Sequence, residues 1–490
     1  MVQRKLRLLA ASLFLHVQTS IAFQSHFAMN KKTGVSGSLV SAQLVELNMQ
    51  PAKTNEETNK RRIESLSAVS IADEWDSPPK SLVLDSTLVE SSLLPVLSTS
   101  LMITGNTVGA GMLVLPELVA GPGMALSSSI FVGAFLINLL SGLLIAEVAI
   151  NQHNASGNDV PSSFKDFAEV NLNSKTAANA IAGCSVFVNA LVMAFNTVKI
   201  GGVGSAMAQG IVSSNAISMA WALACVALVG TQSFKSLSTV TSLLVTGLFI
   251  SFAGLLLPGM AHMTADPMSI LMAPGTSTDI MASACQLAPI VLMSLVYQNI
   301  VPTVTKMLDY DRSRTAAAIT IGSLIPLVMY MAWAFAVVGG GVDMSVGLDG
   351  PLMSLFSLTT IGGSSIGCIM SLSEEFDTFV KPSEDEPQQN DDKYSLPAVL
   401  ASVGCSLVAA QFFSNDLNEA LKVAGSFGTP LLYGILPVLM AHTQQKNKTV
   451  QTPSDGLPVF SLGLLGAASS GFVGNELLQS AGNVFATLSL

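Results

Sequence analysis

The sequence is short of charge. Only 11% of its 490 residues are Asp, Glu, Lys or Arg, whereas a typical soluble protein has about 25%. Half of the residues are hydrophobic, and the mean hydropathy is +0.56. A soluble fold of this size would need more charge to cover its surface. The composition therefore excludes an ordinary soluble protein and predicts a surface that faces lipid.

An excess of basic residues is also missing. The net charge is −10, so the basic patches that bind nucleic acid are not expected. The cysteines are few, and each lies in an apolar run without metal-ligand spacing, so we interpret them as small packing residues; they are Cys184, Cys225, Cys285, Cys368 and Cys405. We expect no metal site and no cofactor.

Catalytic motifs are missing as well. The sequence has no G-x-x-x-x-G-K-[ST], no H-E-x-x-H and no G-x-S-x-G, which argues against ATP-driven transport and against intramembrane hydrolysis. An enzyme is therefore not expected. A channel is disfavoured because the chain has no repeated filter segment.

The N-terminal region has the composition of targeting sequences. Residues 1–22 combine a basic start, a short apolar stretch and small residues at a cleavage position, as in a signal peptide. Residues 23–91 form a transit-like, largely disordered tail. Together they resemble the bipartite plastid presequence of algae with secondary plastids, which points to the inner envelope. The alternative is a signal anchor or a disordered tail, with an endomembrane or plasma-membrane location.

Long apolar runs begin at residue 92 and continue to residue 485, the predicted transmembrane domain. Eleven runs approach the length of about 20 residues that a bilayer requires. The predicted spans are 93–119, 124–148, 177–207, 214–231, 236–257, 280–303, 316–338, 352–374, 395–413, 417–441 and 457–480. The sequence thus predicts an all-α integral membrane protein.

Basic residues lie on one side of this arrangement. The connections on that side contain Lys165, Lys175, Lys235, Lys306, Arg312, Arg314, Lys381, Lys393, Lys446 and Lys448. The opposite connections contain no Lys or Arg; they are 120–123, 208–213, 258–279, 339–351 and 414–416. By the positive-inside rule the first set lies inside.

Two predicted spans are interrupted by helix-weakening residues. Span one contains Gly105, Gly109 and Gly111 and then Pro116, and span six contains a Tyr-Gln-Asn-Ile-Val-Pro segment that starts at Tyr297. Irregular backbone at membrane depth is tolerated where it lines a cavity or is buried. Interrupted helices in corresponding positions of two repeats indicate a transporter site.

We therefore expect the substrate to bind at these two interruptions. Free N–H groups would hold a carboxylate and free carbonyls an ammonium group. The predicted binding residues are Asn106, Thr107, Val108, Gly109, Ala110, Gly111, Tyr297, Gln298 and Asn299. The alternative is that the glycines serve helix packing.

The run from Gly105 to Pro116, GNTVGAGMLVLP, resembles the first span of the tyrosine/tryptophan permeases, the hydroxy and aromatic amino acid permease family. Further segments match in order, including LLIAEV at the end of span two and GSFG in span ten. The resemblance implies eleven spans and the five-plus-five inverted repeat of the leucine transporter. It also implies transport of tryptophan, tyrosine or phenylalanine with protons. A sodium-coupled carrier or an exporter of another amino acid is the alternative.

Charged residues inside the spans are candidates for ion coupling, because they are costly there. These are Lys199 in span three, Glu117 directly after Pro116, and Glu147 at the inner end of span two. Ser364 and Ser365 are candidates for a sodium ion. The acids from Glu374 onward are interpreted as a solvated loop.

Overall fold

The computed structural model describes residues 86–109, 111–161, 163–263, 266–340, 350–380, 393–413 and 417–446, together with residues 463, 465–471 and 474. These residues form helices and turns, with no strand among them. The predicted targeting segment and most of the tail lie outside the described residues. The residues from Leu94 onward belong to one compact unit, whereas Ser86–Leu93, the start of the first helix, is assigned to another.

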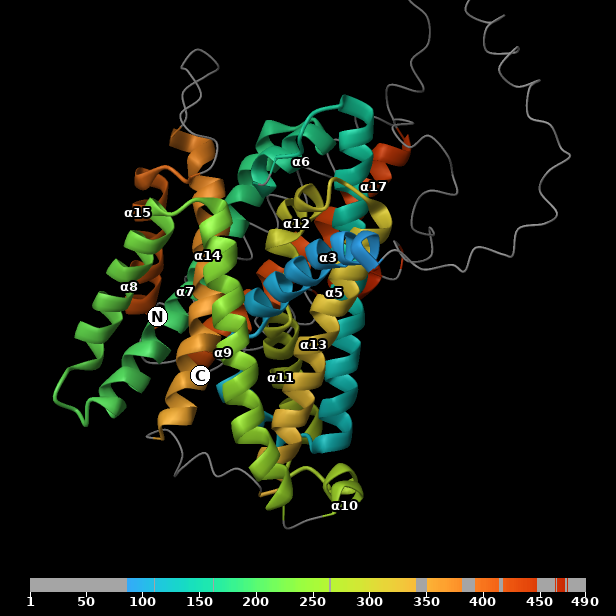
Figure 1. Cartoon of the computed structure of the whole chain (residues 1–490). Coiled ribbons are helices and arrows are strands. Elements are labelled where there is room, and N and C mark those ends of the chain that lie inside the picture. Colours follow the sequence, from blue (N-terminus) through green and yellow to red (C-terminus); the bar gives the residue numbers. More distant parts are fainter. Residues whose placement is uncertain are drawn as a thin grey trace, which may run out of the picture. The chain divides into compact units, whose positions relative to one another are not determined.

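Two broken helices and a set of long continuous ones make up the fold (Figure 1). The first broken helix consists of α3 (Ser86–Thr107) and α4 (Gly111–Val119), and the second of α11 (Ile280–Ser294), the short η1 (Gln298–Ile300) and α12 (Val301–Met307). The continuous helices are α5 (Met124–Ser156), α7 (Lys175–Met207), α8 (Ser214–Thr231), α9 (Phe234–Ala261), α13 (Arg312–Val338), α14 (Pro351–Val380) and α15 (Leu396–Phe412).

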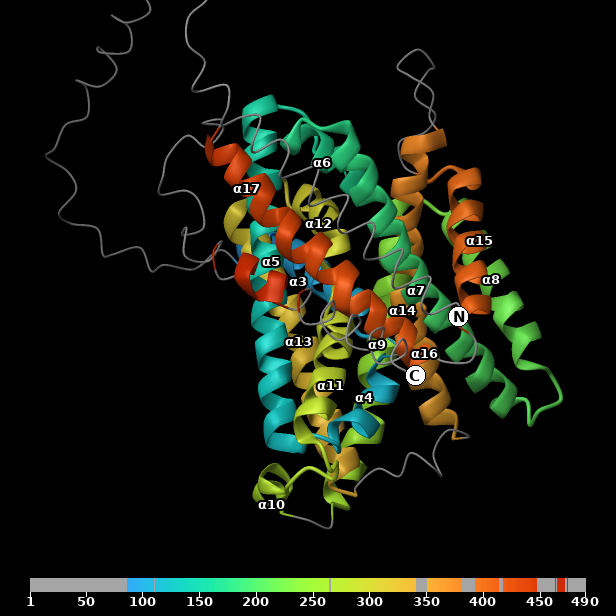
Figure 2. The same cartoon turned by 180° about the vertical axis from the view of Figure 1, so that it is seen from behind.

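The last long helix is continuous but not regular. It runs through α16 (Leu417–Val423), two π-helical turns named η2 (Ala424–Gly428) and η3 (Leu431–Ile435), and α17 (Leu436–Lys446). Figure 2 shows this helix crossing the rear of the molecule, with α17 next to α5 and α6 (Phe164–Leu172). Such π-turns are frequent near functional sites because they interrupt regular hydrogen bonding.

Among the described residues, eight helical segments are long and apolar enough to cross a membrane. They correspond to the predicted spans two to eight and ten. The ninth predicted span, α15, is apolar but shorter. The predicted eleventh span lies largely outside the described residues, although 465–471 is helical. The multi-pass membrane character is confirmed.

The first helix starts before the first predicted span. Helix α3 begins at Ser86, before the expected start at residue 93 and within the segment assigned to the tail. Leu88 and Glu90 favour helix, so the helix extends past the apolar run that a hydropathy reading detects.

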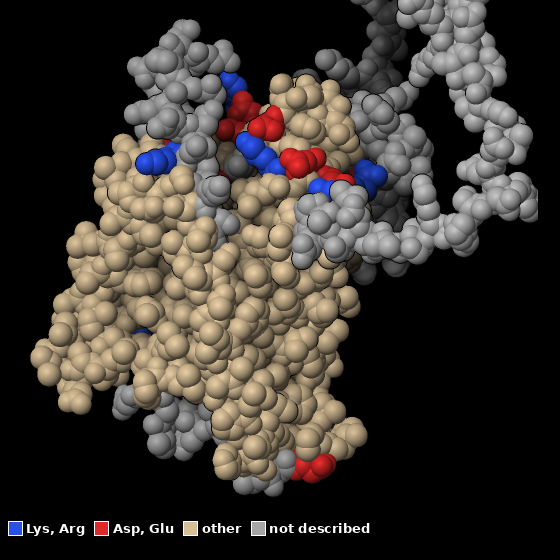
Figure 3. Space-filling view, in the orientation of Figure 1, with Lys and Arg blue, Asp and Glu red and all other residues tan. Residues whose placement is uncertain are grey.

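The surface matches a lipid environment. Large apolar side chains point outward along the long helices, including Leu223, Leu243, Ile250, Val328 and Val408. Figure 3 shows Lys and Arg gathered with many of the acids at the end that holds α6 (Phe164–Leu172) and α12, while the flanks below are nearly free of charge. This distribution agrees with the sidedness inferred from the sequence.

The interpretation of a solvated acidic loop is wrong for its first residues. Glu374 and Glu375 lie inside α14, which extends to Val380. Glu375 is only 1% exposed. The error has a simple cause, because acids near the end of an apolar span can be buried when backbone N–H groups of another helix satisfy them. The acids from Glu384 to Asp392 lie outside the described residues.

Candidate substrate site at the helix breaks

The first break lies between α3 and α4. The chain leaves the helix after Thr107, and α4 begins at Gly111. The last carbonyls of α3 and the first N–H groups of α4 therefore lack partners within a helix. Among the described residues, Met112 N–H donates across the gap to the Gly109 carbonyl at 3.0 Å. The break exposes donors and acceptors in the middle of the molecule.

The second break is fixed to α5. The Asn138 amide of α5 donates to the Leu292 carbonyl at 3.1 Å. Asn138 also accepts, with its backbone carbonyl from the Tyr297 hydroxyl at 3.0 Å and with its side-chain oxygen from the Gln298 amide at 2.6 Å. A Cβ on Gly142 would lie 2.6 Å from the Tyr297 hydroxyl, so this glycine makes room for the ring. Tyr297 and Gln298 thus anchor the break.

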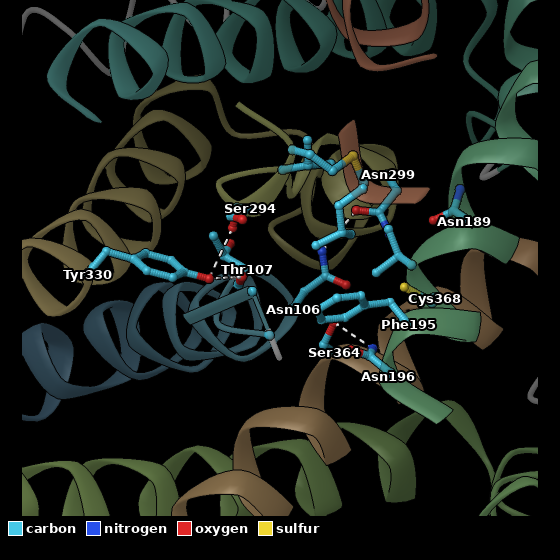
Figure 4. Close-up of a pocket in the computed structure, with 16 residues that line it drawn as sticks. Asn106, Thr107, Asn189, Phe195, Asn196, Ser294, Asn299, Tyr330, Ser364 and Cys368 are labelled. Atoms are coloured by element: carbon cyan, nitrogen blue, oxygen red, sulfur yellow. Dashed lines mark hydrogen bonds between the residues drawn. The ribbon is translucent and has the colours of Figure 1, made fainter. Parts of the chain in front are cut away.

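One hydroxyl links the two breaks. The Tyr330 hydroxyl of α13 lies 3.3 Å from the Thr107 carbonyl and 3.3 Å from the Ser294 carbonyl. Both carbonyls belong to last turns, where intrahelical donors are missing. Figure 4 shows Tyr330 pointing at both residues. A side chain of α13 therefore ties the ends of α3 and α11 together.

Helix α14 approaches the first break very closely. A Cβ on Gly363 would lie 2.7 Å from the Gly105 carbonyl oxygen, and one on Gly367 would overlap the Asn106 side-chain oxygen. Only glycine permits such an approach. Asn106 therefore lies against α14 and donates from its amide to the Asn299 side-chain oxygen at 2.9 Å.

A pocket lies where the two breaks, α7, α14 and α16 meet (Figure 4). No side chain that lines it carries a full charge at neutral pH. The lining residues are Asn106, Thr107, Gly109, Gly111, Asn189, Val192, Phe195, Asn196, Met293, Ser294, Val296, Asn299, Tyr330, Ser364, Cys368 and Leu421. The pocket thus combines amide and hydroxyl groups with an apolar wall.

Two polar groups in the pocket differ in their hydrogen bonding. The Asn196 amide of α7 donates to the Ser364 hydroxyl of α14 at 3.1 Å. The side-chain oxygen of Asn106 is buried and has no hydrogen-bond partner among the described residues. A buried unsatisfied acceptor is costly, so this oxygen is suited to accept from a bound molecule.

The structure brings part of the predicted binding set together. Asn106, Thr107, Gly109, Gly111 and Asn299 line the pocket, whereas Val108, Tyr297 and Gln298 are buried outside its lining. Ala110 lies outside the described residues. Ser364 lines the pocket, and the neighbouring Ser365 is fully buried with no hydrogen-bond partner among the described residues.

Several lining residues were not predicted from the sequence. Asn189, Phe195 and Asn196 come from α7, and Tyr330 and Cys368 from α13 and α14. The spacing of Asn189 and Asn196 was a usable signal, because residues seven apart share a helix face and both are polar in an apolar span. Tyr330 and Cys368 gave no comparable signal.

The coupling candidates lie outside the pocket. Glu147 accepts from the Arg312 guanidinium at 2.6 Å and ties α5 to α13. Glu117 is exposed on α4. Lys199 is half-buried on α7, with its ammonium 5.5 Å from the centroid of Phe195. Since Phe195 lines the pocket, Lys199 is the coupling candidate that lies beside the pocket wall.

The inner connection after α5 is fixed to α12. Asp159 pairs with Lys306 at 2.8 Å, and this hydrogen bond holds the pKa of Asp159 below its ordinary value. The Tyr310 hydroxyl accepts from Val160 N–H at 2.9 Å, and burial raises the pKa of this tyrosine. The half-helix α12 is thereby latched to a neighbouring loop.

Comparison with known proteins assigns the chain to a family. A model of the tryptophan/tyrosine permease family matches residues 94–345, just over half of the chain. The chain belongs to this family. The match covers both helix breaks, and it confirms the resemblance inferred from the first span.

Curated relatives of this permease are similar at modest identity. A tryptophan-specific transport protein of Pseudomonas aeruginosa is 29% identical over 256 residues, which cover 50% of this chain and 57% of the relative. Tyrosine-specific transport system 2 of Haemophilus influenzae is 29% identical over 251 residues, 49% of this chain and 57% of the relative. The permease thus spans somewhat more than half the length of the relatives it matches.

Proposed function

We propose that this permease is a secondary active transporter of aromatic amino acids, with tryptophan, tyrosine and phenylalanine as substrates. The observation that carries the proposal is a charge-free pocket built on two broken helices. Its relatives are described as tryptophan- and tyrosine-specific transport proteins, and this supports the substrate class.

The proposed binding mode uses backbone groups for the charged ends of the amino acid. The first N–H groups of α4, next to Gly109 and Gly111, suit the carboxylate, since a helix N-terminus favours negative charge. The unsatisfied side-chain oxygen of Asn106 suits the ammonium group. Because no lining side chain is charged, a substrate with a charged side chain would be desolvated without compensation.

The ring of the substrate has an apolar wall available. Val192 and Phe195 come from α7, and Met293, Val296 and Leu421 from the other side. Aromatic rings pack favourably against such side chains. Asn189 and Cys368 provide polar groups at this wall, which suit an indole N–H or a phenol hydroxyl.

We further propose the five-plus-five inverted repeat with eleven spans. The order of the elements supports it, since α3/α4 and α11/α12 are broken helices that each precede a series of long helices. Alternating access would then follow from rocking of the two broken helices against α7 and α14. The ion pair between Asp159 and Lys306 would break when the transporter opens to the inner side.

We propose the proton as the coupling ion. Lys199 and Glu117 support proton handling towards the outer side, because Lys199 stands against the pocket wall and the Glu117 charge acts on it. Glu147 would take part only if its pair with Arg312 opened.

The test is uptake of labelled tryptophan, tyrosine, phenylalanine and leucine into liposomes that contain the purified full chain. We expect saturable uptake of tryptophan, tyrosine and phenylalanine, with accumulation inside the liposomes when the outside is more acidic. Equal uptake with and without the pH gradient would contradict proton coupling. Failure to transport or exchange any of the four would contradict the proposed function.

Sodium coupling is the second candidate. Ser364 and Ser365 lie next to the first break, and the Ser365 hydroxyl is buried without a described partner. Hydroxyl and carbonyl oxygens are ligands for hard cations. Replacing external sodium by choline at constant pH distinguishes sodium coupling from proton coupling, because only sodium-driven accumulation would be lost.

For the location we propose a plastid envelope membrane, supported by the composition of residues 1–65 alone. A fusion of residues 1–91 to a fluorescent protein, expressed in an alga with secondary plastids, tests it; retention in the secretory pathway would contradict it.

A further inference from the structure

The inner half of the molecule contains a buried carboxylate to which the proposed transport mechanism gives no role so far. Glu375 of α14 is 1% exposed. One oxygen accepts from Phe164 N–H at 2.8 Å, and the other accepts from Lys165 N–H at 3.3 Å. These donors are the first N–H groups of α6, so the carboxylate fixes the N-terminus of α6 to α14.

Glu375 lies on the pocket side of its helix. Cys368, which lines the pocket, precedes it by seven residues, so both share a face of α14 about 10 Å apart. Asn189 lines the same part of the pocket from α7, and its amide donates to the Ser185 carbonyl at 3.0 Å, one turn closer to the inner end.

Two hydroxyls lie between this part of the pocket and Glu375. The Tyr433 hydroxyl of η3 lies beside Asn189, and the Ser185 hydroxyl lies beside the Glu375 carboxylate. Tyr433 is 2% exposed and Ser185 is fully buried, and neither hydroxyl oxygen makes a hydrogen bond of good geometry among the described residues, although Tyr433 is close to Asn189 and Ser185 to Glu375. Buried hydroxyls normally make well-formed hydrogen bonds. Two hydroxyls near a pocket and a carboxylate that make only poor ones can reorient to pass a proton.

We propose that Glu375 is the proton-binding site of this permease, and that Tyr433 and Ser185 form its route from the substrate pocket. The inference rests on the proposed transport of aromatic amino acids and names the group that couples it to protons. In the outward-open form a proton passes from pocket water along the two hydroxyls to the Glu375 carboxylate.

Protonation would loosen the inner side. The protonated oxygen becomes a donor and no longer accepts from Lys165 N–H, and the negative charge that suits the N-terminus of α6 disappears. Because α6 connects α5 to α7, a weaker contact with α14 favours opening on the inner side. Water then reaches Glu375, the proton leaves to the inside, and the carboxylate binds α6 again.

The charged surroundings allow both protonation states. Burial disfavours the carboxylate, whereas the two N–H donors favour it. From α6, the Lys165 ammonium reaches Thr378 at 3.2 Å, and the charge of Asp166 also acts on Glu375. From η3 the titratable group is Tyr433, which itself lies near Cys184 of α7. On α14 the neighbour is Glu374, which instead accepts from the Tyr394 hydroxyl at 2.9 Å.

The test compares Glu375→Gln with the matched control Glu374→Gln in liposomes that enclose a pH-sensitive dye. Two quantities are measured: exchange of labelled tryptophan at equal pH, and acidification of the interior when tryptophan is added outside. We expect wild type and Glu374→Gln to show both. Glu375→Gln, a mimic of the protonated group, should keep exchange while acidification falls to the level of empty liposomes.

The hydroxyl route is tested separately, in case Glu375→Gln does not fold. Tyr433→Phe and Ser185→Ala remove hydroxyls that make no hydrogen bond of good geometry, so the thermal unfolding temperature should change little. Both should slow tryptophan-driven acidification more than exchange. If Glu375 has only a structural role, acidification and exchange should change to the same extent in these two variants, so that coupling is unchanged.

The outcomes separate this inference from the proposed function. If Glu375→Gln still couples tryptophan to proton influx, or if Glu374→Gln alone loses coupling, the inference is wrong and the transport function stands. If wild-type protein moves tryptophan without protons, the inference is also wrong. If wild type neither transports nor exchanges tryptophan, the proposed function itself fails.

Discussion

At the scale of single residues, the site is made of neutral polar side chains that lack a full set of partners. Asn106 is the main example, since its amide donates to Asn299 while its oxygen has no described partner. Such a half-satisfied group inside a protein has a cost. The cost is offset once a ligand donor, such as an ammonium group, occupies the site.

Asn106→Ala tests this reading. The variant removes the acceptor for the ammonium and the link to the second break, so the KM for tryptophan uptake should rise roughly tenfold, equivalent to about 1.4 kcal/mol of lost binding. The measurement is initial uptake against tryptophan concentration. Asn215→Ala, on the exposed start of α8, is the control with unchanged KM. An unchanged KM in Asn106→Ala would remove this residue from the binding site.

At the scale of helices, the sequence predicted where regular structure ends but not what holds the ends in place. The glycines of span one and the proline of span six marked both breaks, because each residue type has an intrinsic cost in a helix. The contacts of Asn138 and Tyr330 depend on which faces of α5 and α13 meet the breaks. Hydropathy contains no such information, because nearly every side of these helices is apolar.

The same limit explains why two of the predicted residues do not line the pocket. Tyr297 and Gln298 were expected to face the substrate because they lie in the break, yet they face α5. Asn189 and Asn196 line the pocket from a helix without a break. A local signal identifies a broken segment, whereas the walls of the pocket depend on packing between distant segments.

The close approach of α14 to the first break gives a prediction at this scale. A methyl group on Gly367 would collide with the Asn106 side-chain oxygen, so Gly367→Ala should push α14 away or turn Asn106 out of the site. Overpacking of this kind costs about 1–3 kcal/mol. We expect a lower unfolding temperature in detergent and a lower rate of tryptophan exchange.

Gly404→Ala on α15 is the matched control, because a methyl group there meets nothing within 4 Å. In a helix this change should be neutral or stabilising by about 1 kcal/mol. Equal behaviour of the two alanine variants would show that α14 does not need glycine to reach the break.

At the scale of the whole molecule, charge and apolar surface determine how the chain lies in the bilayer. Most of the basic side chains visible in Figure 3 gather at the end that holds α6 and α12, and outward-facing leucine, isoleucine and valine cover the long helices. The proposed proton route runs along this axis, from the pocket towards the basic end. Its direction therefore depends on the orientation of the protein.

The orientation can be tested with two single cysteines in a chain whose five native cysteines are replaced by alanine. Ile211→Cys lies in the turn between α7 and α8, where Ile211 is 86% exposed, and Ala155→Cys lies on the exposed end of α5. Because α7 crosses the membrane once between these ends and basic connections stay inside, a membrane-impermeant maleimide should label Ile211→Cys in intact cells of an expression host. Ala155→Cys should react only after permeabilisation, and the cysteine-free chain should not react at all. Labelling of both from outside would contradict the assignment of α7 as a single span. The reverse pattern would invert the sidedness and, with it, the direction in which Glu375 would release its proton.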